Sequence, residues 1–243
     1  MGLPRFHVPA AAPGARVHFP EHTAHHAREV LRLRPGSSIR VFDGEGHEYE
    51  ATLDAVTRDD VTARLGGQLA PLPESPLRIV LALSPLKGDL MEGVIQKATE
   101  LGVAEIRPVV MARTDAVARP ALRGSRQERW EKVASGAAEQ CGRAVVPPIG
   151  ATTTLEALLA EAFAGLRLAF LETADAPALR RVEATPASVL ALVGPAGGFD
   201  PRELERLAAA GFEPAGLGPR ILRSETAAVA AVAALQMLWG DLG

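Results

Sequence analysis

The sequence predicts an α/β protein in which a small β-rich domain precedes a larger domain with a mostly parallel sheet. In residues 1–70, short segments of alternating polar and apolar residues are separated by turn signals, which is typical of strands. Over residues 77–243, compact apolar runs alternate with helix-length segments, which is typical of an α/β fold. Residues 71–76 contain three prolines and are expected to form the linker.

The first domain is expected to be a small β-barrel with one helix. Residues 38–42 alternate in polarity and meet the turn signal Asp-Gly-Glu-Gly at residues 43–46, after which a strand pattern resumes over residues 47–53. Residues 61–65 are a further strand segment. The helix is expected within residues 21–31.

The second domain is expected to begin with a buried parallel strand, because residues 78–83 form a compact apolar run after Arg78. Further strands are expected at residues 105–110, 166–171 and 188–193. Helices are expected at residues 88–101, 126–141 and 227–238. Another helix should begin at Asp200, where Asp200 caps, Pro201 fits the first turn and Glu203 completes a capping box.

Composition excludes several classes of protein. The 243 residues are 47% hydrophobic, which is enough for a sizeable core. There is no run of about 18 uncharged apolar residues to span a membrane, and the first residues lack the apolar segment of a signal peptide. A cytoplasmic location is therefore expected. The single Cys141 excludes an intrachain disulfide and a cysteine zinc cage.

The types of charged residue are more informative than the net charge. A formal net charge of −3 argues weakly against a nonspecific polyanion binder, although it leaves room for a local basic patch. Only Lys87, Lys97 and Lys132 among the 26 basic residues are lysines. Arginine forks suit phosphates and base edges, but codon bias in a GC-rich genome would also produce this excess.

Other chemistries are excluded or weakened by position. All six histidines lie between His7 and His47, so a Ser-His triad within the α/β region is impossible. His22 and His26 have the i,i+4 spacing of metal ligands but lack a clear third partner, and no metal is expected. Cys141 could be a nucleophile, although a lone helical cysteine is more often simply packed.

A glycine-rich loop over residues 192–200 is the strongest local feature. Its sequence, Leu-Val-Gly-Pro-Ala-Gly-Gly-Phe-Asp, joins an apolar strand to the capped helix. Glycines let the backbone approach a ligand, and the helix N-terminus offers free N–H groups. The spacing matches neither a dinucleotide fingerprint nor a Walker A loop. A ligand is plausible here, but a plain tight turn is the alternative.

A second loop, residues 217–227, precedes the last helix. It contains one glycine, two arginines and Glu225. Either the loop is functional, or Ser224 caps the helix and Arg223 pairs with a nearby acid. A third segment, residues 129–143, contains Glu139 and Arg143 at i,i+4 spacing, which an ordinary solvated helix face also explains.

Read together, these segments resemble the RsmE family of ribosomal RNA small-subunit uridine-N3 methyltransferases, which belongs to the SPOUT superfamily. The two most specific motifs are Gly194-Pro195 with Gly197-Gly198-Phe199, and Leu217-Gly218 with the segments 220–223 and 225–227. Weaker matches cover nearly the whole chain, at residues 4–6, 25–26, 30–32, 42–44, 97–103 and 139–143.

The resemblance implies a PUA-like RNA-binding barrel followed by a SPOUT domain with a C-terminal trefoil knot. It implies S-adenosylmethionine as cofactor, a homodimer, and small-subunit ribosomal RNA or the assembled small subunit as partner. By carry-over, the cofactor-binding residues are Leu171, Glu172, Thr173, Gly194, Pro195, Gly197, Gly198, Phe199, Leu217, Gly218, Ile221, Leu222 and Thr226. One departure is Ala196, where the family usually has Glu, so a carboxylate is missing from the loop.

The implied reaction assigns roles to two residues. Transfer to N3 of uridine needs removal of a proton and stabilisation of negative charge on the flanking carbonyl oxygens. Arg223 is expected to supply that stabilisation, and Glu225 is expected to orient Arg223 or accept the proton. RNA-backbone contacts are expected from Arg5, Arg32, Arg34, Arg123, Arg126, Arg129 and Arg143. The alternatives are an unknotted nucleotide-cofactor enzyme and an RNA-binding homologue with impaired catalysis.

Overall fold

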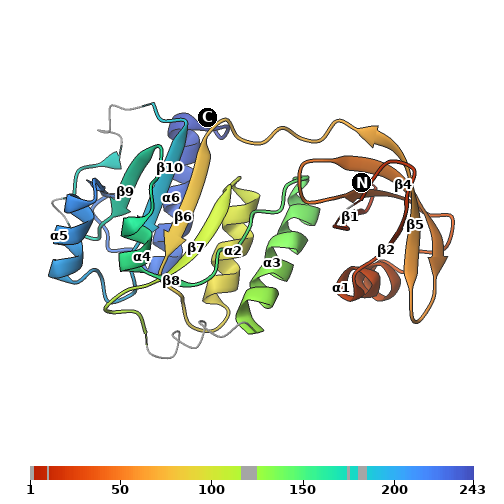
Figure 1. The fold of residues 1–243 in the computed structure, drawn as a ribbon, viewed down its shortest axis with the longest axis horizontal. Helices are drawn as coiled ribbons and strands as arrows, with labels where there is room; N and C mark the ends of the chain where they lie inside the picture. The colour runs from red at the N-terminus through yellow and green to blue at the C-terminus, as the bar shows by residue number, and fades with distance from the viewer. Residues whose placement is uncertain (1–2, 10, 116–124, 174–175, 180–184) are drawn as a thin grey trace. The chain divides into compact units, whose positions relative to one another are not determined.

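The structure, a computed structural model, describes residues 3–9, 11–115, 125–173, 176–179 and 185–243. The chain forms two compact units (Figure 1). The first consists of Met1–Glu74 with Ser135–Val146, and the second of Ser75–Ala134 with Pro147–Gly243. Residues 135–146 were assigned to the second domain from the sequence, but they pack with the first unit.

The first unit is a five-stranded curled sheet in the order β1-β3-β4-β5-β2. Its strands are β1 (Arg5–His7), β2 (Arg16–His18), β3 (Ser38–Phe42), β4 (Glu48–Val56) and β5 (Val61–Leu69). The β1–β3 pair is parallel and the other pairs are antiparallel. The helix α1 (Glu21–His25) continues into a π-helical turn, His26–Val30. Alternating apolar residues such as Ile39, Val41 and Leu53 fill the core, as the sequence pattern predicted.

The second unit is built on a six-stranded parallel sheet in the order β11-β9-β10-β6-β7-β8. Its strands are β6 (Arg78–Leu83), β7 (Glu105–Val110), β8 (Thr153–Thr154), β9 (Leu166–Phe170), β10 (Ser188–Val193) and β11 (Glu213–Ala215). The central strands β6 and β10 are buried along almost their whole length, which explains their continuous apolar sequence. The predicted α/β class is confirmed.

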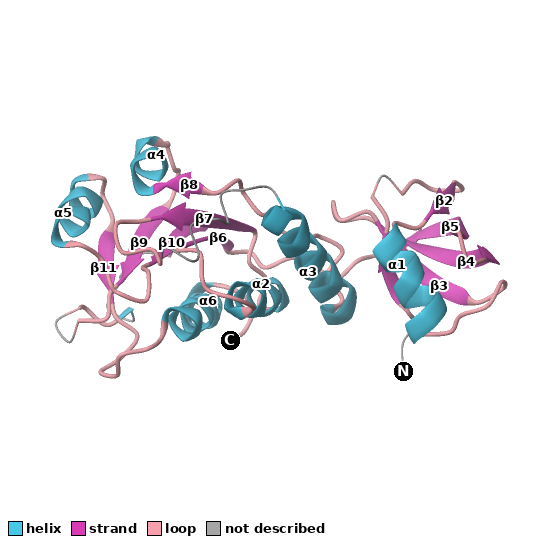
Figure 2. Ribbon diagram, turned by 90° about the horizontal axis from the view of Figure 1, so that it is seen from below, coloured by secondary structure: helices cyan, strands magenta, loops and turns pink. Residues whose placement is uncertain are grey.

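Helices cover both faces of this sheet, as Figure 2 shows. They are α2 (Leu90–Glu100), α4 (Leu155–Ala160), α5 (Pro201–Ala209) and α6 (Ser224–Trp239), while the remaining helix α3 (Ser125–Cys141) has residues in both units. The helices α2 and α6 lie side by side on one face, and α4 and α5 lie on the other. The predicted capping box at the start of α5 is present, with Glu203 accepting the Asp200 amide at 2.9 Å.

The last helix differs from its prediction at its start, since it begins at Ser224, three residues before the predicted start. It buries Ala228, Val232 and Leu235, but Met237 and Leu238 are 59% and 44% exposed. A single chain therefore leaves part of the apolar surface of α6 uncovered. No helix in the described part of the chain is long and apolar enough to cross a membrane.

The parallel order of the second unit decides where its loops meet. Because neighbouring strands run in the same direction, the segments that follow β6, β7, β9, β10 and β11 all emerge at one edge of the sheet. The glycine-rich loop follows β10, and residues 217–223 follow β11. The two motifs singled out in the sequence are thus brought to the same edge.

Candidate functional site

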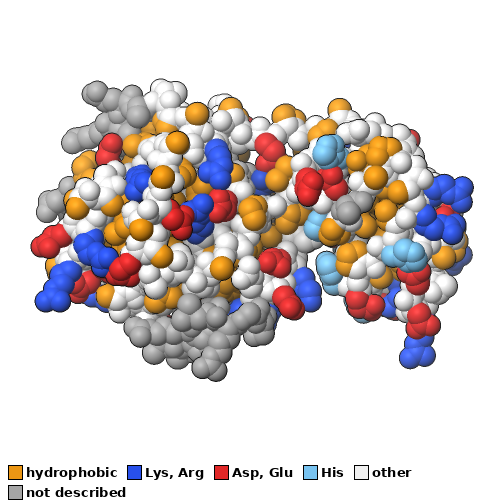
Figure 3. Space-filling view, viewed as in Figure 1, with side chains coloured by type: hydrophobic (Ala, Val, Ile, Leu, Met, Phe, Trp, Pro, Cys, Tyr) orange, Lys and Arg blue, Asp and Glu red, His pale blue; other side chains and the backbone are white. Residues whose placement is uncertain are grey.

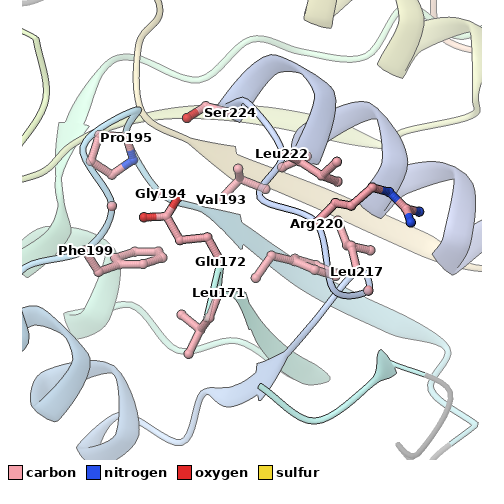
Figure 4. A pocket seen from close by; sticks show the side chains of 14 residues that line it. Leu171, Glu172, Val193, Gly194, Pro195, Phe199, Leu217, Arg220, Leu222 and Ser224 are labelled. Carbon is pink, nitrogen blue, oxygen red and sulfur yellow. The ribbon is translucent and has the colours of Figure 1, made fainter. Parts of the chain in front are cut away.

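A pocket at the carboxyl edge of the sheet is formed by three loops (Figure 4). One follows β9, one follows β10 and one connects β11 to α6. In the view of Figure 4, the side chain of Glu172 points toward Gly194 and the ring of Phe199, while Leu217, Arg220 and Leu222 form the opposite wall. The lining is Phe170, Leu171, Glu172, Val193, Gly194, Pro195, Gly198, Phe199, Leu217, Gly218, Arg220, Leu222, Ser224 and Ala227.

Two glycines allow the loops that line this pocket to pack closely against one another. Gly198 has a φ of 71°, in the left-handed region that favours glycine, and a Cβ there would overlap the Glu172 Oε1 atom. A Cβ on Gly194 would lie 2.8 Å from Cε2 of Phe199. The glycines therefore serve close packing as well as the turn, in which the Gly198 amide donates to the Pro195 carbonyl at 2.9 Å.

A second cleft adjoins this pocket, and the two share Glu172, Pro195, Leu222 and Ser224 as walls. The second cleft contains both residues with predicted catalytic roles, Arg223 and Glu225. Its other lining residues are Ser84, Pro85, Leu86, Lys87, Leu90, Arg113, Asp115, Ala196, Gly197 and Ile221. A ligand in the second cleft would lie beside a ligand in the first pocket. Arg223 and Glu225 would be next to the ligand in the second cleft.

Buried hydrogen bonds tie the loop after β7 to the start of α5. Glu203 is 6% exposed, and its Oε1 accepts the amide of Ala112 at 2.8 Å while its Oε2 accepts the amide of Asp200 at 2.9 Å. The neighbouring Arg113 donates to the Gly197 carbonyl at 3.0 Å. One carboxylate of the capping box thus also positions the rim of the second cleft.

Two family models match this chain. The RNA methyltransferase domain matches residues 73–236, and the RNA methyltransferase PUA domain matches residues 19–66. A ribosomal RNA small subunit methyltransferase E from Synechocystis sp. is 33% identical over 88% of this chain and 70% of that protein. One from Bacillus subtilis is 32% identical over 89% of this chain and 90% of that protein. The chain belongs to this methyltransferase E family.

Solved structures agree with this assignment over the whole chain. A ribosomal RNA small subunit methyltransferase E from Neisseria gonorrhoeae, bound to S-adenosyl methionine, has a TM-score of 0.90 at 35% identity, with both chains covered completely. A Legionella pneumophila protein with the bound cofactor SAM has a TM-score of 0.93 at 34% identity, again over 100% of both chains. The family resemblance and the PUA-like character of the first unit are confirmed.

The structure of this methyltransferase brings most of the predicted cofactor-binding residues into one pocket, but not all of them. Gly197 and Ile221 line the second cleft instead. Thr226 lines an apolar groove between α2 and α6, because consecutive residues of a helix point in different directions and, of the two, only Ala227 faces the first pocket. Thr173 lines neither cavity, and its carbonyl accepts the amide of Ala176 at 3.1 Å as the chain turns.

Several lining residues were missed by sequence reasoning. Arg220 and Ser224 belong to the motif of residues 217–227 that the sequence singled out, so their motif was the available signal. Phe170 and Val193 are the last residues of β9 and β10, and their apolar character was read as strand core. Arg113 and Asp115 carry no motif, and only the parallel strand order places them at this edge.

Two expectations about the loops change in the structure. Ala196, which replaces the usual family Glu, is exposed and lines the second cleft rather than the first pocket. Position 196 therefore lies outside the lining of the first pocket, where Glu172 supplies a carboxylate. The alternative in which Ser224 caps α6 is not supported, because Arg223 occupies the N-cap position and no side chain there makes a capping bond.

Arg5 and Arg143 have internal partners rather than exposed guanidinium groups. The Arg5 side chain is 12% exposed and bonds Glu48 at 2.9 Å, while its Nη1 donates to the carbonyl of Ala138 at 3.0 Å near the end of α3. Arg143 is 9% exposed and pairs with Glu74. Both were predicted to contact RNA, but the structure gives them a structural role, because their donors are engaged by acceptors within the first unit.

The remaining predicted RNA contacts differ in exposure. Arg32 and Arg34 are exposed, and Arg126 is half-buried. Arg129 is exposed and pairs with Glu92 at 2.7 Å. Arg123 lies outside the described residues. On the face seen in Figure 3, basic and acidic side chains are interspersed, which fits the net charge of −3.

Glu139, from the motif of residues 129–143, lies in a buried polar cluster of the first unit. Its Oε1 accepts the amide of His7 at 2.9 Å. Burial raises the pKa of Glu139 to about 7, although the His7 amide and the Arg5 charge both act to lower it. Burial also lowers the pKa of His7, whose Nδ1 lies 2.9 Å from the Ser135 hydroxyl. This cluster holds α3 to the β-sheet rather than forming a surface.

Proposed function

We propose that this methyltransferase transfers a methyl group from S-adenosylmethionine to N3 of a uridine in small-subunit ribosomal RNA. The observation that carries the proposal is the pair of adjoining cavities at one edge of the sheet. One is lined by the glycine loops, and the other contains Arg223 and Glu225. Related proteins named ribosomal RNA small subunit methyltransferase E support the substrate class.

The lining of the first pocket fits an adenosyl cofactor. Leu171, Phe199 and Leu217 offer apolar surface for a purine, and the Glu172 carboxylate accepts hydrogen bonds from hydroxyl or ammonium groups. Because Gly198 has no Cβ, the Glu172 carboxylate can lie directly against its backbone. When bound there, S-adenosylmethionine supplies a methyl group that its sulfonium has already activated.

Arg223 and Glu225 would act on the uracil ring from the second cleft. N3 carries a proton at neutral pH, and its loss leaves negative charge on the flanking carbonyl oxygens. The Arg223 guanidinium donates to one of these oxygens, and the Glu225 carboxylate orients Arg223 or accepts the N3 proton. Since N3 lies on the Watson–Crick edge, the target uridine must be unpaired or flipped out.

Calorimetric titration with S-adenosylmethionine and a methyl-transfer assay test this function. We expect saturable binding at one site per chain, and transfer from radiolabelled S-adenosylmethionine to small ribosomal subunits, or their extracted RNA, from cells lacking this enzyme. Binding of a dinucleotide in place of S-adenosylmethionine would favour the unknotted cofactor enzyme. Binding of RNA without transfer would favour the impaired homologue. Digestion of the labelled RNA to nucleosides locates the methyl group.

We also propose that the protein is a homodimer whose contact includes the groove between α2 and α6. This groove is lined mainly by apolar or small residues, including Val94, Val229 and Ala233. Leu90 at its rim is 47% exposed, and Met237 on α6 is 59% exposed. Exposed apolar surface on adjacent helices favours burial in a two-fold contact.

Val229→Asp should convert the dimer to a monomer, because a carboxylate at this apolar position would lose its hydration on association and would add to the negative charge of Asp89 and Glu225 in the same lining. Sedimentation at micromolar concentration should give twice the mass of one chain for the wild type and the mass of one chain for the variant. Val30→Asp is the matched control, since Val30 is 62% exposed in the first unit. A wild-type mass equal to one chain would refute the dimer.

Further features belong to this proposal. The exposed Arg32 and Arg34 of the PUA-like unit, with Arg126 and Arg129 on α3, are the arginines proposed to contact the RNA backbone. A C-terminal trefoil knot is proposed from the family resemblance. A cytoplasmic location follows from a ribosomal RNA substrate. The chemistry requires no metal.

A further inference from the structure

We infer that the second cleft binds the target nucleotide through a backbone phosphate, and that Lys87 and Arg113 are the cations that hold it. The inference rests on the proposed function, because it names how the RNA substrate occupies the cleft. The cleft has a volume of about 610 Å³, which lies within the range of pockets that hold small ligands.

Lys87 and Arg113 lie in the loops that follow two different strands, and both line the same cleft. Lys87 follows β6 and Arg113 follows β7, two adjacent strands at whose shared edge the loops converge. Both line the cleft that contains Arg223 and Glu225. A nucleotide placed with its base toward Arg223 and Glu225 would have its sugar and phosphate within the same cleft, along the Lys87 and Arg113 rim.

The loop that carries Arg113 is held by buried polar groups. Thr114 is 4% exposed, and its hydroxyl lies 2.8 Å from the hydroxyl of Ser84, which is 1% exposed. The Thr114 hydroxyl also accepts the Met111 amide at 2.8 Å. Together with the bond from Ala112 to Glu203, these contacts anchor the residues on both sides of Arg113. The rim is therefore preorganised by contacts that burial makes strong.

The cations at this rim, Lys87 and Arg113, can exchange some of their present contacts for contacts with a ligand. The Lys87 ammonium lies 2.6 Å from Asp115, but the two side chains are 61% and 35% exposed, so the pair contributes little to stability and can yield to a phosphate. Arg113 is 47% exposed, and its contacts with Gly197 and Asp200 use only part of a guanidinium that has five N–H donors. An arginine fork and a lysine point charge together suit a phosphodiester.

Arg113 also connects this rim to the cofactor loop. Its guanidinium donates to the Gly197 carbonyl, and a Cβ on Gly197 would lie 3.4 Å from Cβ of Arg113. This distance is an ordinary van der Waals contact, so Gly197 lies directly against the Arg113 side chain, and both residues line the second cleft. Lys87 has no such connection, so it is the better residue with which to test phosphate binding alone.

Lys87→Gln tests the inference, with Arg78→Gln as the matched control. Arg78 lies at the opposite end of β6, is 51% exposed and pairs with Glu105 at 2.9 Å. Substrate affinity is measured with small ribosomal subunits from cells lacking this enzyme, across a series of salt concentrations. We expect Lys87→Gln to weaken RNA binding about tenfold and to lower the salt slope by about one. The S-adenosylmethionine affinity should change less than about twofold, and Arg78→Gln should match the wild type.

Three outcomes would overturn the inference. One is an unchanged salt slope for Lys87→Gln, another is an equal loss for Arg78→Gln, and the third is a parallel loss of S-adenosylmethionine affinity. Lys87→Arg should restore the slope, because it restores the charge, and Arg113→Lys should keep the slope while raising KM. A wild-type protein that binds no S-adenosylmethionine would instead refute the proposed function, so the two failures are distinguishable.

Discussion

Arg223→Ala should reduce the single-turnover rate of methyl transfer by about a hundredfold or more, the usual effect of removing one donor to a developing negative charge. Its affinity for S-adenosylmethionine should change less than about twofold, because Arg223 lines the second cleft and not the cofactor pocket. Arg223 is exposed and caps α6 without a side-chain bond, so the melting temperature should hardly change. All three quantities are measured on the same purified variant.

Arg220→Ala is the matched control for this prediction. Arg220 lies three residues earlier in the same loop and is also exposed, but it lines the cofactor pocket. Its loss should weaken S-adenosylmethionine binding more than it slows transfer at saturating cofactor. Arg223→Lys should rescue poorly, because an ammonium lacks the planar fork of arginine. If rate, cofactor affinity and melting temperature fall in parallel in Arg223→Ala, the residue is scaffolding.

Gly198→Ala should abolish measurable S-adenosylmethionine binding and activity in the concentration range that saturates the wild type. Two penalties act together at this position. The φ of 71° costs a residue with a Cβ about 1–3 kcal/mol, and the new methyl group would overlap the Glu172 carboxylate. Either the loop or Glu172 must then move, and both line the cofactor pocket. Calorimetry with S-adenosylmethionine measures the loss.

Gly211→Ala separates the two penalties. Gly211 has a similar φ of 78°, but nothing lies within 4 Å of a Cβ built there. It lies between α5 and β11 and lines neither cavity. This variant should show the drop in melting temperature that backbone strain causes, while S-adenosylmethionine affinity is retained. Equal cofactor affinity in the two variants would contradict the role given to the Gly198 contact with Glu172.

The sequence by itself determined the features that depend on neighbouring residues. The compact apolar run at residues 78–83 predicted a buried parallel strand, because such strands are covered on both faces, and residues 188–193 were predicted as a further strand. The Asp200 to Glu203 spacing predicted the capping box at the start of α5. The glycine-rich loop was recognised from its own residues. The family resemblance added the cofactor S-adenosylmethionine, which two similar solved structures contain.

Only the tertiary structure decided which residues act together. Arg5 reads as a free cation in the sequence, yet it is buried against Glu48 and against the carbonyls of α3, more than 130 residues away. The edge strand β11 is too short and too proline-containing to give a strand pattern. Arg220 and Arg223 lie three residues apart in one loop, yet they line different cavities. These outcomes depend on long-range packing and strand order, which no local periodicity records.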